Sequence, residues 1–340
     1  MNWHSLENKR ILGIVPIEED GSAHFSVPAD TFVFFQLLDE NGMMIQSMRS
    51  GTVLQSGERT GCVGCHENRL SSPPPIGTET PLALMRPPSR LDGWHGPPRP
   101  FGFTAEVQPV LDRHCVECHD YGKEAGRKLN LAGDRTLCFN TAYQELWRKG
   151  YVRCVGGGPA PVQQAYSWGS HASPLIQVLR NPKFPGHETV KLSDEELDRI
   201  ITWIDLNAVY YAYYACAYPD SLTGRSPLDG AQLGRLSQLT GLDIGRARNH
   251  GDNPGPQVSF DRPPLSPCLM RFTDKNDPAY KEALAIIEAG KAMLAKRPRA
   301  DMPGFVPCEK DLSREQKYAA RRQAELRSRK AIHDGAKVYD

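Results

Sequence analysis

Two short cysteine–histidine motifs carry most of the chemistry that this sequence offers. Each places two cysteines three positions apart and a histidine directly after the second: Cys62, Cys65 and His66 in CVGCH, and Cys115, Cys118 and His119 in CVECH. This spacing lets the two thiols reach both vinyl groups of a haem while the imidazole binds its iron. The sequence therefore predicts two covalent c-type haems, with His66 and His119 as iron ligands.

The competing interpretation of these motifs is a zinc site, because two CxxC pairs can supply four thiolates. Zinc does not need a histidine directly after each pair, and the chain has only 10 histidines in 340 residues. Haem attachment therefore explains the histidines better. A structural zinc ion held by the remaining cysteines or histidines has no sequence pattern to support it.

The second haem needs a sixth iron ligand from the chain that follows His119. In small cytochromes this ligand precedes the last helix of the domain, and the corresponding residues 184–193 contain His187 and no methionine. This predicts ligation by His119 and His187, which gives a lower potential than histidine–methionine ligation. His171 is the alternative ligand. Either histidine could instead be an ordinary loop residue that is hydrogen-bonded to the backbone.

The distal ligand of the first haem stays open at this point. The candidates are His24, His95, Met43, Met44 and Met48. Methionines are more often core filler than ligands, and none of the five stands out. An iron with an open coordination position is where chemistry beyond electron transfer could occur.

The segments that must position the motifs predict an α+β fold with four parts. Residues 1–70 have short apolar runs separated by turns, including an Asn41-Gly42 turn of type I′, and predict a small β-sheet or sandwich of three or four strands. Residues 71–103 form a proline-rich linker. Residues 104–215 predict a mainly α, class I-like cytochrome c domain, and residues 216–340 a helical, loop-rich extension.

Helices are expected on both sides of the second motif. One begins at Thr104 as its capping residue and is bent or restarted by Pro109 before the motif. Another begins at Ser193, which forms a capping box with Glu196. Further helices are predicted at 228–239, 277–296 and 312–335, and the last is so rich in charge that it should be solvated.

Five cysteines lie outside the two motifs: Cys138, Cys154, Cys216, Cys268 and Cys308. Their number is odd, so at least one stays unpaired within the chain. Cys268 and Cys308 are the pair that would most readily form a disulfide, because each follows a proline in a stiff loop. The alternative is two inert buried thiols.

The charge balance excludes some classes of partner. The 41 basic and 40 acidic residues leave a formal charge of +1, which points to neither nucleic acid nor an anionic membrane surface. The sequence contains no run of about 18 apolar residues, so it predicts no membrane-spanning helix. The N-terminus lacks the apolar core of a secretory signal, yet c-type haem is normally attached outside the cytoplasm. We therefore expect a piece of a longer exported protein, located in the periplasm or an equivalent extracytoplasmic compartment.

A series of short motifs precedes and includes the first CxxCH: IVPI, EDGSA, VPA, FQLLD, MRS, GER and CVGCHE. Together with the second CxxCH, the loop AYSWGSHASP at 165–174 and residues 192–211, they resemble the hydrazine synthase alpha subunit family. The resemblance implies an N-terminal β-propeller that this chain lacks, a β middle domain with the first haem, and a cytochrome domain whose second haem has two histidine ligands.

The first haem site departs from that family. In hydrazine synthase this haem is catalytic, a tyrosine four residues after the motif histidine is its proximal ligand, and the histidine binds zinc. Leu70 occupies the tyrosine position here, so His66 is expected to remain an iron ligand. We therefore expect a dihaem electron-transfer module that works with a redox partner protein or the missing propeller. The alternative is a haem oxidoreductase whose open first haem acts on a small nitrogen or oxygen species.

Overall fold

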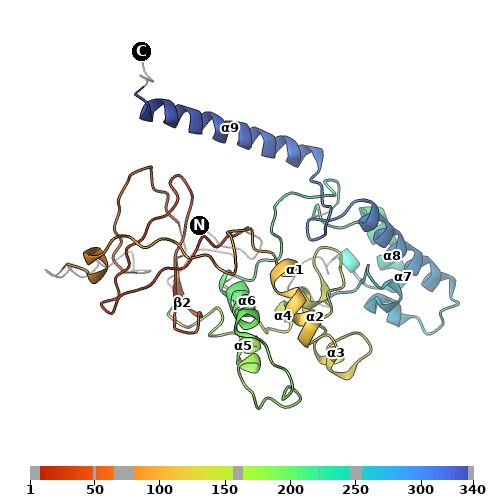
Figure 1. The fold of residues 1–340 in the computed structure, drawn as a ribbon. Coiled ribbons are helices and arrows are strands. Elements are labelled where there is room, and N and C mark those ends of the chain that lie inside the picture. Colours follow the sequence, from red (N-terminus) through yellow and green to blue (C-terminus); the bar gives the residue numbers. More distant parts are fainter. Residues whose placement is uncertain are drawn as a thin grey trace. The chain divides into compact units, whose positions relative to one another are not determined.

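The computed structural model describes most of the chain, and its arrangement is drawn in Figure 1. The described residues are 8–48, 51–64, 80–155, 164–221, 223–245 and 255–335. They divide into two compact units: unit 1 comprises Met1–Asp134, Phe139–Ala212 and Asn249–Pro256, and unit 2 comprises Arg135–Cys138, Tyr213–Arg248 and Gln257–Asp340. A small sheet and several helices together give the α+β class that the sequence predicts.

The sheet of unit 1 is one antiparallel hairpin of β1 (Gln36–Leu38) and β2 (Met44–Ser47). Its turn differs from the expected type I′. Only Gly42 has a positive φ, of 73°, and its amide donates to the Asp39 carbonyl at 3.0 Å. The Asp39 carboxylate accepts from the amides of Asn41 and Met43, both at 2.9 Å. This side chain holds the turn in a type I shape closed by a left-handed glycine.

The other predicted strands are wrong in the described part of the chain. Single β-bridges replace continuous ladders at four places in these residues: Arg10, Ile14, Phe25 and Val33. Three of these bridges reach the proline-rich segment, at Ser89, Asp92 and Pro100. Proline has no amide hydrogen to donate, so a ladder along this segment cannot extend far. The segment expected to be a linker is thus a pairing partner of the N-terminal residues.

The predicted helix break before the second motif is confirmed. Helix α1 (Phe103–Glu106) ends at Val107, and α2 (Gln108–His114) begins again with Pro109 in its first turn. Thr104 lies inside α1 and does not cap it, because the helix begins one residue earlier, at Phe103, with Gly102 as its N-terminal cap. Helix α6 (Asp194–Asp205) has the predicted Ser193–Glu196 capping box and contacts α1.

Three short helices lie between the second motif and α6: α3 (Glu124–Lys128), α4 (Thr141–Arg148) and α5 (Pro174–Leu179). A fourth short element, a 3₁₀ helix, spans Leu82–Met85. Asn140 caps α4 by accepting from the Tyr143 amide. Asn at this position satisfies one of the free amides at the start of a helix.

Aromatic side chains form the core between α1, α4 and α6. Phe103 packs on Trp203 with ring centres 4.8 Å apart, and Tyr143 packs on Tyr210 at the same distance. The polar ends are satisfied as well: the Tyr143 hydroxyl donates to Ala208 O at 2.8 Å, and Trp203 Nε1 donates to Val209 O at 3.0 Å. Satisfied polar ends let large aromatic side chains be buried without an unpaired donor.

Unit 2 contains the three later helices that the sequence predicts. These are α7 (Gly230–Thr240), α8 (Pro278–Lys296) and α9 (Glu309–His333), with 3₁₀ turns at Pro263–Leu265 and Pro267–Arg271. Helices α7 and α8 pack together, whereas Asp311 is the one buried residue of α9. Within the described ranges, every helix is too short or too polar to cross a membrane.

Candidate functional site

The second CxxCH motif forms a tight helical turn at the end of α2. Cys115 is the C-terminal cap of this helix, and its carbonyl accepts from the amides of Cys118 at 3.1 Å and His119 at 2.8 Å. One turn therefore carries both thiols and the imidazole. Neither thiol is in a disulfide. Burial raises the pKa of the Cys115 thiol to about 11, whereas Cys118 is exposed.

The His119 ring is fixed by the chain that follows it. Its Nδ1 lies 2.8 Å from the carbonyl oxygen of Leu129, and the Leu131 amide donates to the His119 carbonyl at 2.9 Å. Because a carbonyl can only accept, Nδ1 carries the proton and Nε2 keeps its lone pair for a metal. Burial lowers the pKa of His119, which favours the neutral ring that a metal binds.

The structure brings His187 to the ring of His119. The two ring centres are 5.9 Å apart and the ring planes are inclined by 21°. Two imidazoles that bind one metal from opposite sides through bonds of about 2 Å place their centres roughly 6 Å apart. His187 Nδ1 is buried and has no hydrogen-bond partner. The separation of the two ring centres thus matches that of two imidazoles on opposite sides of one iron.

The alternative ligand, His171, has a different neighbour. Its Nε2 lies 3.1 Å from Asp39 Oδ2, and its ring meets Tyr166 edge-on with centres 4.9 Å apart. The structure therefore places His171 against the hairpin turn and His187 against His119.

The first motif is only partly described. Cys62 is exposed, and Cys65, His66 and Leu70 lie outside the described residues. Three distal candidates have protein partners: His95 Nε2 is 2.6 Å from Asp198 Oδ2, Met43 Sδ is 2.7 Å from Arg180 Nη1, and Met44 Sδ is 3.2 Å from Gln36 Nε2. Met44 is fully buried. These contacts do not test which residue binds the first iron, so the ligation of the first haem stays a prediction.

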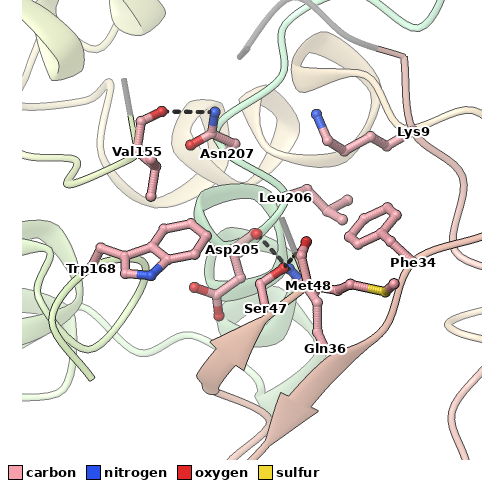
Figure 2. A pocket seen from close by; sticks show the side chains of 10 residues that line it. All are labelled: Lys9, Phe34, Gln36, Ser47, Met48, Val155, Trp168, Asp205, Leu206 and Asn207. Atoms are coloured by element: carbon pink, nitrogen blue, oxygen red, sulfur yellow. Dashed lines mark hydrogen bonds between the residues drawn. The ribbon is translucent and has the colours of Figure 1, made fainter. Parts of the chain in front are cut away.

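A buried carboxylate that the sequence analysis did not single out lies at the end of α6. Asp205 Oδ1 accepts from the Ser170 amide at 2.6 Å, and Oδ2 accepts from the Ser170 hydroxyl at 2.8 Å and the Met44 amide at 3.0 Å. Its backbone carbonyl accepts from Gln36 Nε2 at 2.7 Å. Figure 2 shows Asp205 beside Gln36 and Trp168 in a small pocket of unit 1.

This carboxylate joins three segments of unit 1: the hairpin, the 164–173 loop and α6. Burial raises the pKa of Asp205 to about 7, although the hydrogen bonds oppose this shift. A Cβ on Gly169, whose φ is 75°, would lie 2.5 Å from Asp205 Oδ1. Glycine therefore lets the loop backbone approach the carboxylate.

We predict that Asp205 makes the free energy of unfolding depend on pH. In the unfolded chain an aspartate loses its proton near pH 4, whereas folded Asp205 keeps it to about pH 7. Raising the pH through this window therefore favours unfolding, by up to about 1.4 kcal/mol per pH unit. Asp205→Asn should flatten this slope in denaturant titrations followed by circular dichroism. Asp194→Asn, at the exposed start of α6, should keep the wild-type slope; parallel curves for all three proteins would exclude Asp205 as the source.

The sequence did contain a signal for Asp205. It lies four residues after Ile201, on the apolar face that defines α6, and an acidic residue there must find partners.

The disulfide considered between Cys268 and Cys308 is not formed, because Cys308 faces a different thiol. Its Sγ is 3.7 Å from Cys216 Sγ. Cys268 is buried, and its amide donates to Gln257 O at 3.0 Å. Cys138 lies 3.0 Å from the Thr223 hydroxyl and Cys154 lies 3.7 Å from Ile204 O. None of the five non-motif cysteines is therefore in a disulfide in the structure.

Comparison with known proteins points to one family. Residues 1–67 match the family model of the hydrazine synthase alpha subunit middle domain. The hydrazine synthase subunit alpha of Kuenenia stuttgartiensis is 22% identical, over 60% of this chain and 33% of the relative. The solved structure of Kuenenia stuttgartiensis hydrazine synthase matches with a TM-score of 0.39 and 19% identity, over 58% of this chain and 33% of that chain. The chain thus spans about a third of the curated relative, and it is similar to the hydrazine synthase alpha subunit family, whose middle domain its first 67 residues match.

Proposed function

We propose that the chain is a dihaem c-type cytochrome module that transfers electrons within a hydrazine synthase alpha-like protein. The observation that carries this proposal is the pair of facing imidazoles, His119 and His187, next to the two free thiols of the second motif. Cys115 and Cys118 would hold the second haem by thioether bonds, and the two histidines would bind its iron. The first haem would attach to Cys62 and Cys65, with His66 as its ligand.

The residues around His119 favour a stable electron-transfer site. The Leu129 carbonyl fixes the ring tautomer, so that the ring need not reorient when the oxidation state changes. A haem with two histidine ligands supplies a one-electron couple and offers no open iron position. The second haem is therefore a relay in this proposal. It would exchange electrons with a redox partner protein or with a propeller domain, outside the cytoplasm.

The proposal is tested on the full chain made together with a cytochrome c maturation system. Mass spectrometry of the denatured protein should show two covalently bound haems, and the pyridine haemochrome spectrum should be that of c-type haem. If the protein contains no covalent haem after such maturation, or carries zinc on the motif thiols instead, the proposal is wrong. A high-spin component that binds CO would indicate an open first haem and favour a catalytic role.

A further inference from the structure

Three potential metal ligands meet in unit 2, far along the sequence from both haem motifs. They are the thiols of Cys216 and Cys308 and the carboxylate of Asp311, and their ligand atoms lie within 4.8 Å of one another. Cys308 caps the N-terminus of α9, and Asp311 lies in the first turn of that helix. Cys216 joins them because the Cys308 amide donates to its carbonyl at 2.8 Å.

The separation of the sulfurs fits one tetrahedral ion. Cys216 Sγ and Cys308 Sγ are 3.7 Å apart, which is too far for a covalent bond. Two thiolates bound tetrahedrally to one zinc ion, with bonds of about 2.3 Å, lie roughly 3.8 Å apart. The distance between the thiols therefore needs almost no adjustment on binding.

The carboxylate is already directed at the thiols. Asp311 Oδ2 accepts from the Cys216 amide at 2.8 Å, and Oδ1 pairs with Arg314 at 2.9 Å. Each oxygen retains a second lone pair for a metal. Burial opposes ionisation of Asp311, but the Cys216 amide and the Arg314 charge outweigh it and lower its pKa.

The charges also balance. A divalent ion that replaces the two thiol protons leaves the net charge of the cluster unchanged, since both protons are released to solvent. Arg314 already compensates Asp311. The ion thus enters without creating an uncompensated charge in a half-buried place.

We propose that Cys216, Cys308 and Asp311 form a structural zinc site that fastens the start of α9 to the rest of unit 2. Asp311 is the one buried residue of this 25-residue helix, so its few contacts near the N-terminus decide whether the helix stays attached. The fourth zinc position is left for water. This site is independent of the haems and would exist even if the haem proposal failed.

The test uses the full chain as it is isolated after production with the maturation system, reduced with a phosphine and given one equivalent of zinc chloride. After removal of excess zinc, inductively coupled plasma mass spectrometry should find one zinc ion per chain. Extended X-ray absorption fine structure at the zinc K-edge should show two sulfur ligands at about 2.3 Å, with oxygen ligands completing the coordination of the ion. This measurement needs no variant, so a folding defect cannot confuse it. A zinc shell without sulfur would overturn the proposal.

Variants then locate the site. Cys216→Ser and Cys308→Ser should each lower zinc retention at least tenfold, whereas Cys268→Ser, at a buried thiol of the same unit, should retain zinc. Zinc that is kept in both variants but lost in Cys115→Ala/Cys118→Ala would belong to the haem motif and would refute this site. A Cys216–Cys308 disulfide in the freshly isolated, zinc-free protein would refute it too.

A further readout reports on the helix. Amide hydrogen exchange at residues 309–315 should slow at least fivefold when zinc is added, because the ion holds the first turn in place. Exchange that stays unchanged in zinc-loaded protein would contradict the fastening role.

Discussion

Replacing both Cys115 and Cys118 by alanine is expected to remove one of the two proposed covalent haems. The thioether bonds of the second haem need both sulfurs, and the two cysteines lie on the turn that also carries His119. The number of covalently bound haems per chain, measured by mass spectrometry of the denatured protein, should therefore fall from two to one. The absorbance of the haem band should drop by about half, because each haem contributes similarly.

The matched control is Cys154→Ser, which changes a half-buried thiol of unit 1 outside the motif. Its Sγ lies 3.7 Å from Ile204 O, and a serine hydroxyl can make the same contact. This variant should keep both haems. Two haems in the Cys115→Ala/Cys118→Ala protein would show that the second motif does not bind haem.

Features that depend on neighbours in sequence were predictable. Pro109 breaks the helix before the motif because its ring and missing amide hydrogen exclude a continuous helix. Ser193 and Glu196 start α6 because the cap and its partner lie within one turn. His187 was proposed as the distal ligand from its place before this helix alone, and this ligation stays a prediction.

Features that depend on partners far away in the sequence could not be predicted in this way. The residues near Ile14 have the composition of a strand, but a single bridge to Asp92 replaces the ladder, because their partner segment is rich in proline. The predicted type I′ turn was wrong for a local reason instead: the carboxylate of Asp39, two residues before Asn41, sets the turn in place of the Asn-Gly pair.

The candidate site shows the same division. The motif itself identifies the thiols and His119, whereas the hydrogen bond that fixes the ring goes to Leu129, ten residues later and beyond α3. Asp205 is satisfied by donors from two other segments, Ser170 and Met44. Sequence patterns report which side chains must find partners, and only the fold reveals which partners they find.

His187→Ala is expected to convert the second haem from low-spin to high-spin and to let it bind CO. Removing the distal imidazole leaves the iron with His119 alone, and a small side chain cannot replace the lost ligand. The fold should survive, because His187 is only half-buried and its Nδ1 has no hydrogen-bond partner to leave unsatisfied. Absorption and paramagnetic resonance spectra report the spin state, and CO difference spectra report the open position.

His187→Met tests the same ligand without opening the iron. Thioether ligation raises the potential of a haem, so the midpoint of the second haem should rise by on the order of 0.1 V. His171→Ala should leave spin state and potential unchanged, because His171 faces Asp39 and Tyr166. If His171→Ala opened the iron and His187→Ala did not, the ligand would be His171, and the approach of His187 to His119 would have to reflect packing alone. The two alanine variants therefore decide between the ligands directly, since each removes one imidazole and leaves the other in place.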